Sequence, residues 1–125
     1  MSSDPRAALE KLRAAALALP AAAERLSHGM EGFHIEGGKF FAYFWHDHHG
    51  DGETAAIVKT SGAEEQAALI ERDPELYYKP PYFGPSGWIA IRIGADDTDW
   101  DHVGDRVAAS WELVAPRRLL EAGGR

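Results

Sequence analysis

The 125-residue chain has no cysteine, and this excludes disulfides, thiolate metal sites and cysteine nucleophiles. It also lacks an apolar run long enough to span a bilayer. Its first residues have no basic start followed by an apolar core, so no signal peptide is visible. We therefore expect a cytoplasmic protein that has no membrane partner.

Positive charge is also scarce, because 13 Lys and Arg face 20 Asp and Glu and leave a net charge of −7. Such a balance disfavours phosphate binding over the whole surface, although it leaves room for a local basic patch. The hydrophobic share of 45% and the charged share of 26% are ordinary for a globular protein. At this length we expect one domain over residues 1–125.

Motifs of catalysis and phosphate binding are absent from the sequence. No serine stands in a Gly-x-Ser-x-Gly elbow, and Gly84-Pro85-Ser86-Gly87 precedes a predicted strand instead of opening a helix. The acidic run from Asp96 to Asp105 has no calcium-loop spacing and suits a helix N-terminus. The sequence therefore favours a non-enzymatic protein and identifies no catalytic residue, metal ligand or cofactor.

The first helix is predicted by Asp4-Pro5, which suits an N-cap followed by the first helical residue. Its apolar stripe contains Leu9, Leu12, Ala16 and Leu19. Pro20 ends it, because the residue before a proline is pushed away from helical angles. Residues 21–26 fit either a second short helix by propensity or a turn and an edge strand.

Two further helices have recognisable starts. Ser61 and Glu64 form a capping box for a helix that stops before Asp73-Pro74. We expect this helix to turn the following side chains inward: Ala63, Ala67 and Ile70. Thr98 or Asp99 caps the next helix, and a short turn over residues 117–121 follows it. The stripe of that helix comprises Trp100, Val103, Val107, Trp111 and Val114.

Strand signals lie between these helices. Residues 33–36 alternate, Gly37-Gly38 predicts a two-residue hairpin loop with positive φ, and residues 39–45 continue as the partner strand. Residues 54–59 form a third strand, and residues 87–93 another, whose isoleucines we expect to face the core. Together these elements predict an α+β domain with an antiparallel sheet that helices cover on one face.

The polar loop from His46 to Asp51 holds the chain's metal-like cluster, in which Asp47, His48 and His49 are the other members. Imidazole and carboxylate suit zinc, nickel or copper. Adjacent residues of a hairpin loop point apart, however, and a solvated loop explains the composition better, because polar hairpin loops need no function. One of two functions that we consider is a metal-dependent or small-ligand-binding protein that uses this loop; it is the alternative to a binding surface on the strands.

Cations and aromatic rings alternate along the predicted strands, a composition that suits nucleic-acid binding because rings stack on bases while cations hold phosphates. We expect Trp45 and Trp88 to pack in the core. Three prolines, at positions 80, 81 and 85, hold a loop that we expect to be exposed. The candidate binding residues are Lys39, Lys59, Tyr78, Lys79, Tyr82 and Arg92.

The order of several short motifs resembles the MmcQ/YjbR-like family of small bacterial domains. The motifs are Leu19-Pro20, Gly38-Lys39-Phe40, Val58-Lys59-Thr60, Tyr77 to Gly87 with its prolines, Gly87-Trp88-Ile89, Ser110-Trp111 and Leu113-Val114. The resemblance implies a double-wing α+β fold and a proposed DNA-binding role with no established catalytic residue. Its implied contact residues are Lys39, Lys59, Lys79 and Arg92. A protein or a small ligand fits the same surface as a partner.

Overall fold

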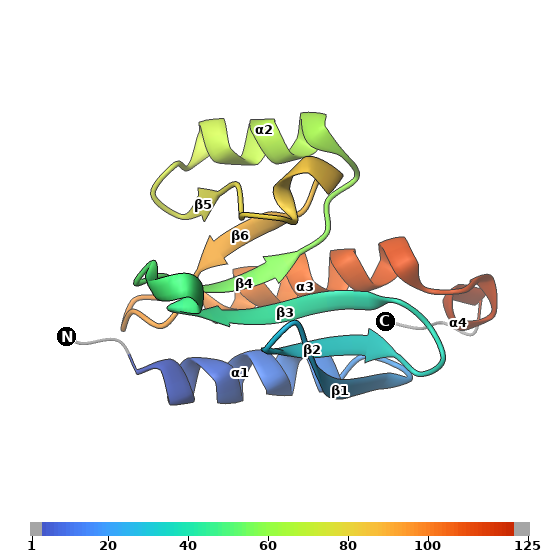
Figure 1. Cartoon of the computed structure of the whole chain (residues 1–125). Coiled ribbons are helices and arrows are strands. Elements are labelled where there is room, and N and C mark those ends of the chain that lie inside the picture. The colour runs from blue at the N-terminus through green and yellow to red at the C-terminus, as the bar shows by residue number, and fades with distance from the viewer. Residues whose placement is uncertain (1–3, 122–125) are drawn as a thin grey trace.

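The computed structural model describes residues 4–121, in which six strands form one sheet in the order β1-β2-β3-β4-β6-β5 (Figure 1). The strands are β1 (Ala22–Ser27), β2 (Met30–Ile35), β3 (Phe40–His46), β4 (Thr54–Val58), β5 (Tyr77–Tyr78) and β6 (Ile89–Arg92). The helices are α1 (Pro5–Leu17), α2 (Ala63–Arg72), α3 (Trp100–Val114) and α4 (Arg117–Glu121), with short 3₁₀ helices η1 (His48–Gly50) and η2 (Gly84–Ser86).

Every neighbouring pair of strands is antiparallel, and α1 and α3 lie against one face of the sheet (Figure 1). Helix α2 lies beyond β5 and adds Leu69 to the same helix-side core. The predicted α+β class, an antiparallel sheet with helices on one face, is confirmed. The buried cluster on the other face includes no residue of an α-helix within residues 4–121, and we call this face the open face.

The helix-side core follows the predicted stripes. Ile89, Ile91 and Ile93 are buried as expected, and they meet buried side chains from two helices: Leu12, Ala16, Val103, Val107 and Trp111. Each large side chain buried in this way contributes about 1.5–3 kcal/mol. The indole N–H of Trp111 donates to the carbonyl of Pro20 at 3.0 Å, so this buried donor is satisfied.

A β-bulge in β3 decides which side chains face the helices. Phe33 pairs with Ala42 and His34 with Phe40, so Phe41 is an extra residue on β3. Phe41 and Ala42 therefore both turn to the helix side, where each is fully buried. Phe40, one position earlier, lies on the open face with Tyr43 and Trp45.

Ser110 holds this bulge from the helix side. Its hydroxyl donates to the carbonyl of Phe41 at 2.6 Å and accepts the backbone N–H of Lys59 at 2.9 Å. Ser110 is completely buried, and its hydroxyl gives both backbone groups a partner. One side chain of α3 thereby connects the bulge to the end of β4.

Two turns differ from the sequence prediction. The loop between β2 and β3 has four residues, 36–39, and it is closed by the N–H of Ile35 donating to the carbonyl of Lys39 at 3.0 Å. Only Gly37 of the predicted glycine pair has positive φ, at +73°. The two-residue loop was therefore wrong, because the bulge shifts the register and leaves a longer connection. For the segment that fitted either a short helix or an edge strand, the edge strand is confirmed, over residues 22–27.

Helix α2 also starts differently from the prediction. Its N-cap is Gly62, and the carboxylate of Glu65, not Glu64, accepts the N–H of Ser61 at 2.8 Å. The predicted capping box is wrong, and Ala63 and Ala67 are exposed, whereas Ile70 is half-buried against the helix-side core as predicted. The buried polar residue is Gln66, whose amide donates to the carbonyls of Gly84 at 2.9 Å and Trp88 at 2.6 Å. A polar side chain with such partners is stable in the interior.

The remaining helix predictions are confirmed in outline. Asp4 caps α1 and Asp99 caps α3 through their carboxylates. Helix α1 ends at Leu17, before Pro20, and buries Ala8 beside Leu12 and Ala16, whereas Leu9 is only half-buried. No helix in residues 4–121 combines the length and apolar character required to cross a membrane.

We predict that Ser110→Ala destabilises the protein by about 2–4 kcal/mol, because it leaves a buried carbonyl and a buried N–H unpaired. Chemical denaturation of the two proteins measures this difference. Leu113→Ala on the same helix is the control, since Leu113 is 48% exposed. Its cost should stay below about 1 kcal/mol. Equal costs for the two substitutions would contradict the bridging role.

We predict that Glu24 contributes to the free energy of unfolding in a pH-dependent way. Its carboxylate joins β1 to α1 by accepting two hydrogen bonds from Arg13 at 2.7 and 2.9 Å. These bonds hold the pKa of Glu24 below its ordinary value of 4.5. The stabilisation is therefore complete at neutral pH and is lost as pH falls through the lowered pKa. Glu24→Gln should cost about 0.5–1 kcal/mol at neutral pH and almost nothing in strong acid. Urea titrations at both pH values measure this, and a cost that does not change with pH would refute it.

Candidate functional site

The open face of the sheet carries a cluster of packed aromatic rings, formed by Phe40, Tyr43, Phe83 and Trp88. Their centroids are 4.9–5.7 Å apart, with Tyr43 in contact with the other three. We call residues 79–87, which contain the three prolines, the proline loop. Phe83 belongs to this loop and Trp88 lies between it and β6, so the loop folds across the open face. We call these four residues the ring cluster. Burial raises the pKa of Tyr43, so its phenol stays neutral.

Gly32 makes room for the ring cluster. A Cβ atom at this position would lie 2.6 Å from Cε2 of Phe40 and 3.2 Å from Cδ1 of Tyr43. Because Gly32 has no side chain, the Phe40 ring packs directly against the backbone of β2. This requirement explains a glycine in the middle of a strand, where the residue is otherwise unfavourable.

Three cations lie over rings of the open face. The Arg25 guanidinium is 4.9 Å from the centroid of Phe40, and the Lys59 amine is 5.9 Å from that of Trp88. Arg92 lies 4.6 Å above the ring of Tyr78. Such pairs are weakly attractive when exposed, and they keep the cations close to the aromatic surface. The open face therefore combines apolar rings with positive charge.

A pocket of about 560 Å³ lies at the end of the open face where β2 begins and β3 ends. Its lining residues are His28, Met30, Trp45, His48, Tyr82 and Phe83, and we call it the open-face pocket. Trp45 and Met30 form a buried floor, at 1% and 4% exposure. The walls come from the β1–β2 turn, the 3₁₀ helix η1 and the proline loop. The volume is in the range of small-molecule sites.

Unfavourable backbone conformations gather around this pocket. Within residues 4–121, four residues other than glycine have positive φ: Ala21, His28, Asp47 and Tyr82. Two of them line the pocket, and Asp47 directly precedes η1 and its lining residue His48. Each such residue costs on the order of 1 kcal/mol or more, and strain of this kind is concentrated at functional sites.

The polar loop that the sequence offered as a metal cluster has structural roles. Asp51 accepts the indole N–H of Trp45 at 2.8 Å, and Asp47 accepts the N–H of Gly52 at 2.7 Å. His46 shares a hydrogen bond of 2.9 Å with the hydroxyl of Thr54. Among the described residues no group of three His, Asp or Glu is arranged to hold a metal ion, and the side chain of His49 lies outside the description.

Three of the predicted binding residues meet at one end of the sheet. Lys39 directly precedes β3, Lys59 directly follows β4 and Lys79 directly follows β5. Because β3 is antiparallel to β4, and β6 is antiparallel to both β4 and β5, these three positions lie at the same end. We call it the lysine end; it is on the right of the sheet in Figure 1. Lys39 and Lys79 are exposed, and Lys59 is half-buried above Trp88.

The other three candidates lie elsewhere. Tyr82 is 74% exposed at the rim of the open-face pocket. Arg92 ends β6 at the opposite end from the lysines, where two bonds of 3.0 and 3.2 Å join it to Glu53. Tyr78 lies beneath Arg92, and burial raises the pKa of its phenol. Arg92 is thus committed to contacts within the chain.

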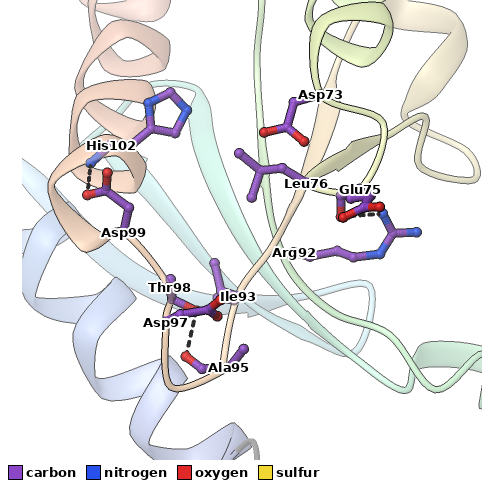
Figure 2. Close-up of a pocket in the computed structure, with 10 residues that line it drawn as sticks. All are labelled: Asp73, Glu75, Leu76, Arg92, Ile93, Ala95, Asp97, Thr98, Asp99 and His102. Carbon is purple, nitrogen blue, oxygen red and sulfur yellow. Dashed lines mark hydrogen bonds between the residues drawn. The ribbon is translucent and has the colours of Figure 1, made fainter.

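A second cavity, of about 570 Å³, lies between the end of β6 and the start of α3 (Figure 2). Hydrogen bonds within the chain engage several of its polar groups. Asp99 caps α3, Thr98 donates to the carbonyl of Ala95 at 2.8 Å, and His102 shares a short hydrogen bond with Tyr77. Figure 2 shows Arg92 directed to the carbonyl of Glu75, 3.0 Å away. This cavity is acidic and internally bonded, so we place the candidate site on the open face.

Sequence reasoning missed most of the open-face pocket. His28, Met30 and Phe83 were not singled out from the sequence. The detectable signal was Ser27-His28-Gly29-Met30, in which His28 and Gly29 both have positive φ and close a two-residue hairpin between β1 and β2. Trp45 was expected to pack, and it is buried, but as the floor of a pocket. Trp88 is half-buried within the ring cluster.

Comparisons with known proteins agree on the fold. A family model described as YjbR matches residues 17–113. The solved structure of Deinococcus radiodurans protein DR2400, assigned to domain family DUF419, is similar with a TM-score of 0.67 and 16% sequence identity. That similarity covers 89% of this chain and 80% of the other. No curated protein matches the chain.

We predict that Asp51→Ala destabilises the protein by about 1–3 kcal/mol, because it removes the acceptor of the buried Trp45 indole N–H. Asp51→Asn is the matched variant, since its amide oxygen still accepts one bond, and its cost should be clearly smaller. Urea denaturation followed by tryptophan fluorescence measures both. If the two variants cost the same, the carboxylate does not hold the pocket floor.

Proposed function

The chain belongs to the YjbR family, and on that premise we propose that it is a non-enzymatic binding module that holds single-stranded nucleic acid over the open face. The observation that carries the proposal is the lysine end beside the ring cluster. Amines there are placed to hold phosphates, and the neighbouring rings offer surfaces on which unpaired bases stack. Trp88 connects the ring cluster to the lysine end, because its ring lies under the amine of Lys59.

The distribution of acidic residues supports the proposal. Residues 61–75 and 96–121, which include α2, α3 and α4, hold 12 of the 20 acidic residues and four of the 13 basic ones. The remaining sequence holds eight acidic and nine basic residues, so it is nearly neutral. The net charge of −7 therefore comes from these helical segments, and those of their carboxylates that lie more than about 8–10 Å from the open face are screened from a polyanion bound there.

Two carboxylates limit the extent of the proposed contact. Glu36 in the β2–β3 loop and Glu64 at the start of α2 are exposed near the lysine end. These carboxylates limit the positively charged surface to the short segment around the three lysines, so this surface suits a strand of only a few nucleotides. Single strands fit better than duplex, because the bases of a duplex are already stacked on one another.

We predict that a fluorescein-labelled single-stranded oligonucleotide binds the wild type with an affinity that falls as salt rises. Three phosphate contacts give a log–log salt slope of roughly −2, or an affinity loss of about 20-fold between about 50 and 200 mM NaCl. The variant Lys39→Gln/Lys59→Gln/Lys79→Gln should lose most of this slope and about ten-fold in affinity at low salt. Fluorescence anisotropy measures both quantities.

The matched control is Arg6→Gln/Lys11→Gln/Arg72→Gln, which removes the same charge from exposed positions on α1 and α2. Its affinity should remain within about two-fold of the wild type, because these charges lie on α1 and α2 and are not among the three lysines that the proposal uses. Equal weakening by both triple variants, absence of binding at low salt, or tighter binding of duplex would each overturn the proposal.

A further inference from the structure

The open-face pocket is lined by side chains of one chemical kind. Five of its six lining residues carry a ring and the sixth, Met30, carries a thioether. None is Asp, Glu, Lys or Arg, and only His28 and His48 can take a charge, so the lining has no permanent charge for an ionic ligand. Rings prefer offset or edge-on ring partners at 4.5–7 Å, and a methionine sulfur contacts ring edges favourably. The lining therefore selects a flat aromatic group.

The pocket is held in shape by contacts outside it. The floor ring of Trp45 is fixed by its bond to Asp51, and His48 stands edge-on to it with centroids 4.8 Å apart. Phe83 is fixed by Tyr43 and Trp88 of the ring cluster. A site whose walls are already ordered spends little of its binding free energy on ordering them. The positive-φ residues His28 and Tyr82 hold the turn and the loop in the conformations that complete the walls.

From this geometry we propose that the open-face pocket binds one flat, uncharged heteroaromatic ring system of one or two rings. The volume of about 560 Å³ suits a compound of that size. The ring has two possible sources, a free small molecule or the base of a bound strand. The site stands independently of the nucleic-acid proposal, because none of the three lysines lines it.

The test uses Met30 as a reporter, since the chain has only two methionines and Met30 forms part of the floor. Indole and thymidine are titrated separately into the full chain labelled with ¹³C at the methionine methyls. We expect the Met30 methyl signal to shift and saturate, because a ring bound on the floor shields it, while the Met1 signal stays constant. A shift that does not saturate, or one shared equally by Met1, overturns the site.

Tyr82→Gly tests the wall without straining the backbone, because glycine adopts the φ of +67° that this position has. Loss of the ring should weaken indole binding by about ten-fold, whereas Tyr82→Phe should stay close to the wild type. Leu26→Ala is the distant control, since Leu26 is 71% exposed on β1 and does not line the pocket. Equal affinity of Tyr82→Gly and Leu26→Ala overturns the site.

Competition then distinguishes the two sources. If the ring is a nucleobase, a short oligothymidylate displaces indole from Met30, and Lys39→Gln/Lys59→Gln/Lys79→Gln weakens the oligonucleotide but not indole. If the ring belongs to a free compound, indole stays bound in the presence of the oligonucleotide. Both results support the pocket. If the wild type binds indole but shows no salt-dependent binding of the oligonucleotide, the proposed function is overturned and the pocket proposal is not.

Discussion

The extra residue at Phe41 is the constraint on which both faces of the sheet depend. Side chains of a regular strand alternate, so without the bulge Phe41 would join Tyr43 and Trp45 on the open face, and Phe40 would turn toward the helices. With it, Phe41, Ala42 and Phe44 enter the helix-side core while Phe40 completes the ring cluster. A bulge leaves the ladder locally disrupted, and the hydroxyl of Ser110 gives the freed carbonyl of Phe41 a partner.

The sheet therefore buries apolar side chains on both sides. Strand β4 shows the consequence in its sequence, because Ala55, Ala56, Ile57 and Val58 are all fully buried. Small residues at the first two positions let α3 approach from one side and the rings from the other. The helix-side core contains most of the large buried side chains, and the open side carries the ring cluster without an α-helix over it among residues 4–121. Proline and glycine in residues 79–87 allow that loop to fold across the open side in a fixed conformation.

Much of the fold was readable from local chemistry. Asp4, Asp99, Pro20 and the alternating isoleucines of β6 act within a few residues, so their patterns predicted the elements correctly. The bulge was not readable, because it depends on Ser110, 69 residues away from Phe41. The buried face of α2 was predicted only at Ile70, since Gln66 is polar and its burial is explained only by two carbonyls of a distant loop. The sequence singled out the lysines and Tyr82 as candidates, but the pocket floor required tertiary structure, because a buried Trp or Met has the pattern of an ordinary core residue.

The amide of Gln66 has a consequence for the pocket that its role in α2 does not suggest. Its two hydrogen bonds reach the carbonyls of Gly84 and Trp88, which flank the tightest part of the proline loop. Phe83, directly before Gly84, is a wall of the open-face pocket. Helix α2 and that wall are therefore joined through one buried amide. A substitution at Gln66 would disturb the wall of the pocket from a helix that contributes no residue to its lining.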